Sequence, residues 1–535
     1  MLALSLCLAA CLTLGAPANA LTGRGTWNHL GTNGANGPAI NGDVSEMYAT
    51  SSTMYVGGSF TNAGGIEAAD RIAKWNGNSW SAVGTTGIAD DIEDGSVLAI
   101  AVHGGKVYAG GTITNAGDDA AADFLAVFDG ESWEPFCNTG VGPAFGGEVR
   151  ALQVIGPELY VAGEFQDANG IPAADYLVAC NLSTGQMRTT VNDPNHPFSS
   201  PVNDLIATSD GTLYAGGSFT DLDDIPDADN VASYKNEVWD SLGSTPIGGE
   251  VHGLHANGTT LYVTSEGEDI GGNARSDHLV KWNGSAYSHV GGNGSGDGYF
   301  PSGATINELT TSGSLLFAAG DWENANGAPT GDMLAYFNGS SWRPLGSNGA
   351  GSPDGALNGI TEALAVLGGQ VYAGGASTDA GGDPVADFAA SRSLRLPDAT
   401  IAGSTGAYVG NNAYNGTAAG QSKSLEIARG RSKTFRIVVN NDGLVPARFK
   451  LKGSGAARGY SIKYVEVRRG KRRDITSSVK RGTYMTPTVP ETAGFRMDVV
   501  VKLSKRSARN ASFVVKATSM PNHPVDAVKG VVKAK

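Results

Sequence analysis

The sequence predicts an all-β protein: a seven-bladed β-propeller closed by its N-terminal strand, followed by a β-sandwich. Three observations lead to this prediction. One segment recurs seven times at spacings of 48 to 55 residues, glycine is frequent while charged residues are few, and the composition changes after Pro397. Glycine supplies 77 of the 535 residues and charged residues 17%, which is typical of many short strands joined by tight turns.

The repeat is clearest in a strand-like run that begins with an aromatic residue and continues with small ones, as in residues 55–60. The seven leading aromatics are Tyr55, Tyr108, Tyr160, Tyr214, Tyr262, Phe317 and Tyr372. Fifteen residues after each of them stands an aspartate, and the seven are Asp70, Asp123, Asp175, Asp229, Asp277, Asp332 and Asp387. A fixed period of this length indicates a repeat architecture in which each copy is one supersecondary unit.

Each copy contains four short apolar segments. In the second copy these segments are residues 97–102, 106–109, 124–128 and 132–136. Gly104-Gly105 joins the first pair and Asp129-Gly130 the second, and both dipeptides accept the positive φ angles of two-residue hairpin turns. Four antiparallel strands in a meander form one blade of a propeller.

The fourth segment carries an aromatic residue in most copies. These residues are Trp80, Trp133, Trp239, Tyr287 and Trp342, with a degenerate copy near Met187. The seventh copy lacks a fourth segment, and a matching one stands near the start of the chain around Trp27. We therefore expect the N-terminal strand to complete the last blade, which removes the exposed sheet edges that promote aggregation.

A glycine doublet, an aromatic strand ending in Asn-Gly or Asp-Gly, and a following tryptophan make residues 26–395 similar to the kelch or galactose-oxidase type of repeat. The fifth copy departs from this pattern, with Thr264-Ser265 in place of the doublet. Galactose-oxidase relatives join a seven-bladed propeller to a C-terminal immunoglobulin-like domain, so the resemblance implies that arrangement. The family is diverse in function, and the match therefore constrains shape more than activity.

The resemblance also implies an oxidase as a candidate activity. In galactose-oxidase relatives the copper is held by two Tyr and two His, with one Tyr cross-linked to Cys. Both cysteines of the repeat region lie in outer segments of their copies. His252 and His255 share a strand but point to opposite faces, and the C-terminal domain offers only His523. We predict a non-enzymatic binding protein, with a secreted carbohydrate-active or galactose-oxidase-like enzyme as the alternative.

Residues 1–20 form an uncharged apolar run that ends in a small-x-small cleavage signature, which predicts a signal peptide and a secreted or cell-surface protein. In the alternative, residues 8–11 are a bacterial lipobox and a lipid on Cys11 anchors the protein. After cleavage only Cys137 and Cys180 remain, and they form either one disulfide or two buried thiols.

Charge divides the chain in two. Residues 1–400 carry 12 Lys and Arg against 45 Asp and Glu, whereas residues 401–535 carry 26 against 7. The two parts therefore attract each other or serve different partners. In a four-stranded meander, the loops after the second and fourth strands emerge on one face, and these loops are long and acidic. We expect an extracellular protein or glycan to bind that face.

The repeat aspartate ends the loop between the second and third segments. It either accepts N–H bonds within the loop or belongs to a ring of Ca²⁺ sites, and its recurrence in all seven copies favours the structural interpretation. No cofactor is predicted, and calcium remains open. The densest cluster of carboxylates for calcium is Asp221, Asp223, Asp224, Asp227 and Asp229.

A second set of acids lies two positions after the leading Val or Ile of the first segment. Its members are Glu46, Asp204, Glu308 and Glu362. If the first strand is innermost, these acids gather at the mouth of a central channel, with those of copies six, seven and one adjacent. They either hold a cation or cationic ligand or form a solvated acidic rim.

We place the domain boundary at residue 397, with the propeller at 21–397 and a basic domain at 398–535. Strand-like runs in residues 398–535 alternate apolar with polar residues, which predicts an immunoglobulin-like sandwich. Its densest basic cluster is Arg468, Arg469, Lys471, Arg472 and Arg473. This cluster either tethers the protein to an anionic cell-wall polymer or lipid head groups, or docks on the acidic propeller. We expect no specific nucleic-acid binding and no transmembrane segment.

Overall fold

The computed structural model describes residues 27–535, apart from residues 86–87, 89–94, 139, 141, 192–196, 226, 245–246, 295, 329, 347–354, 456–458, 492, 507–509 and 520–523. The predicted signal peptide, the alternative lipid site at Cys11 and His523 lie outside the described residues. The described chain is all-β and divides into two compact units, Trp27–Arg392 and Ser393–Lys535.

The first unit consists, within its described residues, of seven four-stranded antiparallel sheets. Six of them are consecutive meanders: β2 (Val44–Ala49), β3 (Met54–Gly58), β4 (Ile72–Trp75) and β5 (Trp80–Ala82) in sheet 1; β6 (Val97–His103), β7 (Lys106–Gly111), β8 (Leu125–Phe128) and β9 (Trp133–Pro135) in sheet 2; β10 (Val149–Ile155), β11 (Glu158–Gly163), β12 (Leu177–Asn181) and β13 (Met187–Thr189) in sheet 3; β14 (Val202–Ala207), β15 (Leu213–Gly217), β16 (Val231–Lys235) and β17 (Val238–Ser241) in sheet 4; β18 (Val251–Asn257), β19 (Thr260–Ser265), β20 (Leu279–Trp282) and β21 (Tyr287–His289) in sheet 5; β22 (Thr305–Ser312), β23 (Leu315–Asp321), β24 (Leu334–Phe337) and β25 (Trp342–Pro344) in sheet 6.

Sheet 7 combines the two ends of this unit. It contains β26 (Thr361–Leu367), β27 (Gln370–Gly375), β28 (Ala389–Ser393) and β1 (Asn28–His29). Asn28 pairs with Ser391 and His29 with Ala390, so the first strand of the chain takes the place of a fourth strand. Short 3₁₀ turns follow the second strands, at η1 (Ala63–Gly65), η2 (Ala116–Asp118), η3 (Ala120–Ala122), η4 (Ala168–Gly170), η5 (Leu222–Asp224), η6 (Ile270–Gly272), η7 (Ala325–Gly327) and η8 (Ala380–Gly382).

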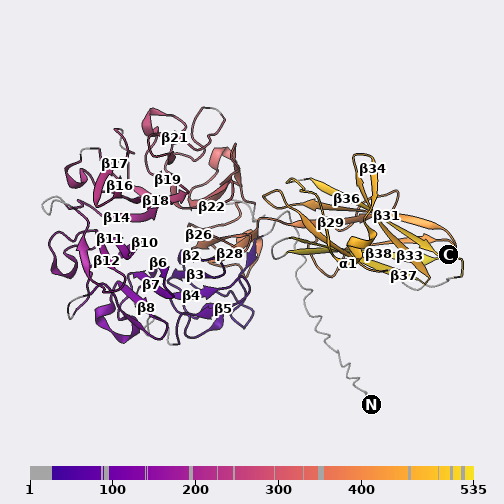
Figure 1. The fold of residues 1–535 in the computed structure, drawn as a ribbon, viewed down its shortest axis with the longest axis horizontal. Helices are drawn as coiled ribbons and strands as arrows, with labels where there is room; N and C mark the ends of the chain where they lie inside the picture. Colours follow the sequence, from indigo (N-terminus) through magenta and orange to yellow (C-terminus); the bar gives the residue numbers. More distant parts are fainter. Residues whose placement is uncertain are drawn as a thin grey trace, which may run out of the picture. The chain divides into compact units, whose positions relative to one another are not determined.

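The first strands of the seven sheets lie at the centre of this unit (Figure 1). Each contacts the first strand of the next sheet along the chain, and β26 of sheet 7 contacts β2 of sheet 1. The fourth strands lie at the periphery (Figure 1).

The glycine doublet that marks the repeat is required by close packing. A Cβ atom on Gly57 would lie 2.7 Å from Cγ1 of Val97 in the next sheet, and one on Gly58 would overlap the carbonyl of Asp43. A Cβ on Gly374 would meet Val44 across the junction of sheets 7 and 1 in the same way. Because real Cβ atoms do not approach this closely, the first glycine is needed where adjacent sheets meet and the second where β3 passes the start of β2 in its own sheet.

The fifth copy compensates for its missing doublet. Thr264 stands where most copies have the first glycine, and its partner on the neighbouring strand is Gly253. The Thr264 hydroxyl accepts a hydrogen bond from the Gly253 N–H at 2.8 Å. The small residue has therefore moved to the opposite strand of the pair, and the close approach is kept.

Indole groups connect neighbouring sheets at the periphery. Five tryptophans in or directly before a fourth strand donate the Nε1–H to a backbone carbonyl just after the fourth strand of the preceding sheet, at 2.5 to 3.4 Å: Trp27 to Leu345, Trp80 to Leu30, Trp133 to Val83, Trp239 to Thr190 and Trp342 to Val290. The first two of these bonds join sheet 7 to its neighbours on both sides. The aromatic residue seen in the sequence is thus a contact between sheets.

A disulfide connects sheets 2 and 3, at one of the two places where this indole is missing. Sheet 3 has Met187 at the tryptophan position, and Cys180 of its β12 is bonded to Cys137, which follows β9 of sheet 2. The Cα atoms are 5.6 Å apart and the residues are separated by 43 positions. Of the two alternatives left open by the sequence, the structure has the disulfide, and it joins the sheets covalently.

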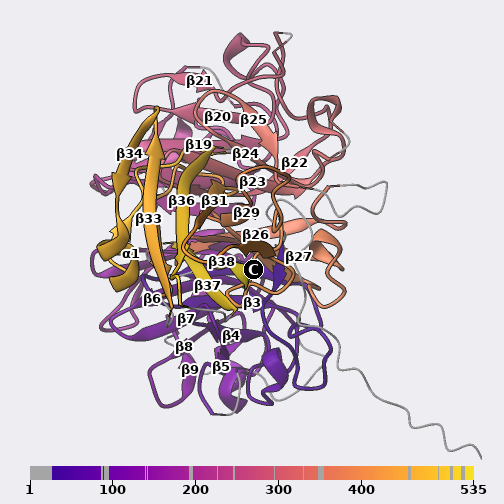
Figure 2. The same cartoon turned by 90° about the vertical axis from the view of Figure 1, so that its right-hand side faces the viewer.

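The second unit contains two five-stranded sheets. Its elements are β29 (Pro397–Ala402), β30 (Ser422–Ile427), β31 (Ser432–Asn441), β32 (Phe449–Gly453), β33 (Tyr460–Arg468), β34 (Lys471–Asp474), α1 (Thr476–Arg481), β35 (Tyr484–Met485), β36 (Gly494–Leu503), β37 (Ala511–Ser519) and β38 (Val525–Ala534). One sheet has the order β29-β31-β36-β33-β34 and the other β30-β38-β37-β32-β35, with β30 and β38 parallel. Figure 2 shows the long strands β31, β36 and β33 side by side.

One core joins the two sheets of this unit. Phe435 of β31 and Tyr464 of β33 belong to the same buried cluster as Phe449 of β32 and Phe513 of β37. The alternating burial along β31 places every second side chain in this core, as expected of a sheet with one wet face. Among the described residues, no helical segment has the length and apolarity that a membrane crossing requires.

Candidate functional site

The seven repeat aspartates close seven nearly identical loops. In each copy the backbone N–H eight residues earlier donates to the aspartate Oδ1 at 2.5 to 2.9 Å: Asn62 to Asp70, Asn115 to Asp123, Asp167 to Asp175, Asp221 to Asp229, Asp269 to Asp277, Asn324 to Asp332 and Asp379 to Asp387. All seven donors are Asn or Asp with left-handed φ angles of 48° to 54°, a conformation that these two residue types tolerate. The structural interpretation of the repeat aspartate accounts for all seven.

The residue after each aspartate also has a left-handed backbone, with φ between 57° and 66° in every copy: Arg71, Phe124, Tyr176, Asn230, His278, Met333 and Phe388. Such angles cost free energy in a residue other than glycine and persist only where the surroundings impose them. The loops are therefore fixed supports, and their variable side chains are what distinguishes one copy from another.

The calcium candidates lie on one of these supports. Asp221, Asp223 and Asp224 all have left-handed backbones in the η5 turn, and Asp229 closes that loop. Asp227 stands between them in the chain. Across the described ranges, no group of three or more His, Cys, Asp or Glu side chains is arranged to hold a metal ion.

An axial cavity of about 420 Å³ lies among the first strands, and residues from all seven sheets line it. Glu46 of β2, Asp204 of β14 and Glu308 of β22 are three of them. Asp204 also joins two sheets, because its carboxylate accepts the N–H of Leu205 at 2.7 Å and that of Leu254, in β18, at 2.6 Å. Three of the four acids predicted from the sequence thus line one cavity among the first strands.

The three cavity acids repel one another. Burial, with the repulsion of Asp204, raises the pKa of Glu46 to about 8. Burial also raises the pKa of Asp204 to about 7, although two backbone N–H groups favour its ionised form. Burial and the charges of Asp204 and Glu46 raise the pKa of Glu308. At neutral pH this group therefore retains protons that a bound cation would displace.

Glu362 does not belong with these three acids, and its predicted placement is wrong. Each first strand carries a β-bulge, which in β2 lies between Val44 and Glu46 and in β26 between Thr361 and Ala363. Glu362 is therefore the bulged residue, and Ala363 corresponds to Glu46. The sequence register failed because Ile360, taken as the leading apolar residue, is 40% exposed.

Glu362 lies with different neighbours, since Ser45, the bulged residue of the adjacent sheet, is its hydrogen-bond partner. Burial raises the pKa of Glu362, and the Ser45 hydroxyl opposes that shift.

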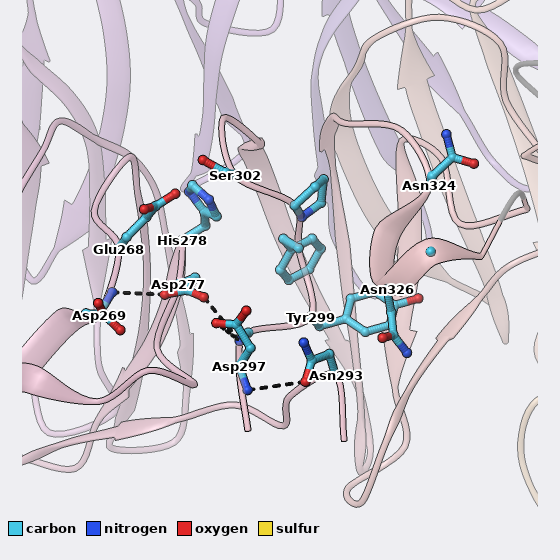
Figure 3. Close-up of a pocket in the computed structure, with 14 residues that line it drawn as sticks. Glu268, Asp269, Asp277, His278, Asn293, Asp297, Tyr299, Ser302, Asn324 and Asn326 are labelled. Carbon is cyan, nitrogen blue, oxygen red and sulfur yellow. Dashed lines mark hydrogen bonds between the residues drawn. The ribbon is translucent and has the colours of Figure 1, made fainter. Parts of the chain in front are cut away.

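A second cavity, of about 400 Å³, lies on the acidic loop face between sheets 5 and 6 (Figure 3). Its walls are the loop after β19, the loop after β21 and the η7 turn. Four carboxylates line it, and no Lys or Arg is among its described lining residues. These acids are Glu268, Asp269, Asp277 and Asp297.

Asp277, the repeat aspartate of sheet 5, holds two walls of this loop-face pocket together. Its Oδ1 accepts the Asp269 N–H at 2.9 Å and its Oδ2 accepts the Gly298 N–H at 3.1 Å. On the far side of Gly298, the Asp297 N–H donates to the Asn293 side chain at 3.2 Å (Figure 3). The pocket is thus built by backbone hydrogen bonds and not by chance apposition of loops.

Two buried polar side chains in the pocket have no hydrogen-bond partner among the described residues. They are His278, 2% exposed with both ring nitrogens unpaired, and Tyr299, 5% exposed with its hydroxyl unpaired. Burial raises the pKa of Tyr299 to about 12, so its hydroxyl stays protonated. Figure 3 shows His278 beside Glu268, and Tyr299 beside Asn326 on the other side.

Sequence reasoning missed this pocket. The available signal was the fifth copy, which departs from the repeat at Thr264-Ser265 and carries His278 directly after its repeat aspartate. Nothing in the sequence brought His278 and Tyr299 together.

The basic cluster of the second unit forms the tip of the hairpin between β33 and β34. Arg468 pairs with Lys471 across a turn in which Arg469 has a φ of 47°. Arg472 contacts Asp498 at 2.7 Å and Arg473 contacts Glu466 at 3.4 Å. All five basic side chains are exposed. Two of the five charges are therefore partly neutralised within the unit, while the tip itself faces solvent.

Comparison with known proteins gives no family. No protein-family model and no curated protein matches the chain. A solved family 123 glycoside hydrolase from Clostridium perfringens, described for glycolipid glycan hydrolysis, is 9% identical with a TM-score of 0.19, over 26% of this chain and 27% of the hydrolase. Domains 4 and 5 of the S-layer protein SbsC are 10% identical with a TM-score of 0.14, over 34% and 71%. Likenesses this small carry no argument.

Proposed function

We propose that this protein is a secreted or cell-surface, non-enzymatic binding and scaffold protein. Its acidic loop face carries the ligand, and its basic C-terminal domain tethers it to an anionic surface. The observation that carries this proposal is the loop-face pocket, where a fixed support presents four carboxylates. The same pocket contains two buried polar side chains, His278 and Tyr299, that have no hydrogen-bond partner within the described chain.

The proposal includes a finer description of the fold. The seven sheets are the blades of a kelch or galactose-oxidase type propeller that β1 closes, and the second unit is an immunoglobulin-like sandwich. Three features support closure: β1 pairs with β28, β26 contacts β2, and the Trp27 indole donates to Leu345 as the other indoles do to theirs. Closure gives a rigid face, because every sheet then has two neighbours and no long edge is left free.

The tethering role is supported by the hairpin tip of β33 and β34. Arg468, Arg469 and Lys471 project there from a turn of only two residues, so their charges act together on a polyanion. Attraction by charge alone decreases as salt screens it, with a Debye length of about 8 Å at physiological ionic strength.

A glycan array probed with the intact chain tests the binding role, with binding to the Glu268→Gln variant compared in parallel. Retention on whole cell walls at low salt, and its loss in a variant with Arg468, Arg469 and Lys471 all changed to Ser, tests the tether. Metal analysis of the purified protein discriminates the enzyme alternative: stoichiometric copper with turnover of an alcohol would overturn the proposal.

A further inference from the structure

The polar residue His278 is exceptional among the seven residues that follow a repeat aspartate. At the position after the repeat aspartate, the other copies have either an apolar side chain or a polar one with a partner. Phe124, Met333 and Phe388 are apolar, the Asn230 side chain donates to Gly217, the Arg71 guanidinium donates to Ser59, and the Tyr176 hydroxyl accepts from Gln166. Only His278 is a buried polar group whose hydrogen bonds are left unmade in the described chain.

Tyr299 is exceptional in the same way. Asn326 donates its N–H to the Tyr299 carbonyl at 3.0 Å, and this bond recurs in other copies with an apolar residue as acceptor. The corresponding acceptors are Ala39, Ile88, Ala144 and Ala356. A side chain with a buried hydroxyl therefore stands where these copies have an apolar one, and the fold does not require the hydroxyl.

Unpaired buried polar groups are rare in folded proteins, and each one calls for an explanation. Two of them line one pocket, and both occupy positions where the repeat uses apolar or satisfied residues elsewhere. An external ligand that completes their hydrogen bonds accounts for both. Glu268 is exposed and lies beside His278 in Figure 3.

The charge and polarity of the pocket narrow the ligand. Four carboxylates without a lining cation attract a positively charged group. Asn293, Ser302, Asn324 and Asn326 add amide and hydroxyl groups suited to ligand hydroxyls. Apart from Phe300 and Pro301, the lining side chains are polar or carry a polar group, which suits a hydroxylated ring better than the four-carbon stem of a lysine side chain. A volume of about 400 Å³ is within the range of small-ligand pockets.

We infer that the loop-face pocket binds a glycan bearing a free primary ammonium group, such as an unacetylated hexosamine. This inference rests on the proposed function and names the ligand class of its site. The carboxylates of Glu268 and Asp297 neutralise the ammonium, the His278 imidazole accepts one of its N–H bonds, and the Tyr299 hydroxyl pairs with a ring hydroxyl.

The test measures binding of two disaccharides to the full chain by calorimetry at low and at physiological salt. One is the disaccharide of glucosamine, and the other is its N-acetylated form, which has the same ring but no charge. We expect the charged disaccharide to bind about tenfold more tightly or better, which corresponds to one charge-assisted hydrogen bond, and to weaken as salt increases.

Variants assign the binding to this pocket. Glu268→Gln and Asp269→Asn should each weaken the charged disaccharide several-fold, whereas Asp167→Asn, the same change at the equivalent loop position of sheet 3, should not. Both Asn substitutions are compatible with folding, because Asn occupies this position at Asn62, Asn115 and Asn324. Tyr299→Phe should weaken binding without lowering the unfolding midpoint of the free protein, since it removes a hydroxyl that has no partner in the described chain.

Several outcomes would overturn the inference. Equal affinity for the two disaccharides would show that the ammonium is not recognised. Tighter binding of a tri-lysine peptide would assign the pocket to a protein partner, and calcium binding lost in Glu268→Gln would assign it to a metal. If neutral glycans bind and Tyr299→Phe abolishes that binding, the ligand class is wrong while the proposed function stands. If neither a glycan on the array nor the tri-lysine peptide binds, both fail.

Discussion

Among the seven repeat aspartates, Asp332 should be the most costly to remove. It is 2% exposed, and its two oxygens accept the N–H of Asn324 at 2.5 Å and that of Gly355 at 3.1 Å. A hydrogen bond to a charged group contributes about 1.5–3 kcal/mol, so Asp332→Ala should lower the free energy of unfolding by about 3–6 kcal/mol. Asp123 is half-buried and accepts one such bond, from Asn115. Asp123→Ala should cost about 1–2 kcal/mol, because water reaches the freed N–H.

Guanidinium unfolding of the full chain, followed by tryptophan fluorescence, measures this difference. All eight tryptophans lie between residues 27 and 342, so the signal reports on the first unit alone. Asp332→Asn should give an intermediate loss, since the amide keeps one acceptor but presents an N–H to the second donor. Equal losses for Asp332→Ala and Asp123→Ala would refute the reasoning, because they would mean that the bond to Gly355 contributes nothing.

Three further outcomes are expected from the same unfolding assay. Changing both Cys137 and Cys180 to Ser should cost about 4 kcal/mol, from the loop closed over 43 positions; an unchanged midpoint would contradict it. The pKa of Glu46 is raised on folding to about 8, so the stability it contributes is complete below the unfolded value near 4.5 and is lost as the pH rises through 8. The first unit should therefore unfold more easily at pH 9 than at pH 5. This difference in stability between the two pH values should be smaller in Glu46→Gln; if the variant has the same pH profile as the parent, Glu46 is not the cause. Gly57→Ala should destabilise by about 1–3 kcal/mol, whereas Gly146→Ala, whose Cβ meets nothing within 4 Å, should be neutral; equal midpoints for the two variants would count against the packing argument.

The repeat was readable because periodic features are local. Strands β6 to β9 lie within one or two residues of the four segments expected in the second copy. The loop bond of each repeat aspartate spans eight residues, so one copy contains both partners and seven copies show the pattern seven times. Trp27 was placed correctly beside the seventh copy for the same reason, since it matches residues that recur at a fixed position.

The central acids show where such reading stops. The seventh copy has the buried Thr361 where the other first strands have Val or Ile, so the alignment on the exposed Ile360 moved Glu362 by one position and gave it the wrong neighbours. The actual group, Glu46, Asp204 and Glu308, comes from sheets 1, 4 and 6, which are separated along the chain but meet across the axial cavity.

The sequence by itself therefore determined the repeat, its strands, the structural role of the recurring aspartate and the opposite charges of the two parts, because each depends on short-range spacing or composition. Only the tertiary structure decided which acids face one another, which residue of the seventh copy leads its first strand, and that His278 and Tyr299 share a pocket without hydrogen-bond partners in the described chain. Those properties depend on contacts between loops of different sheets, where distance in space is set by packing and not by position in the chain.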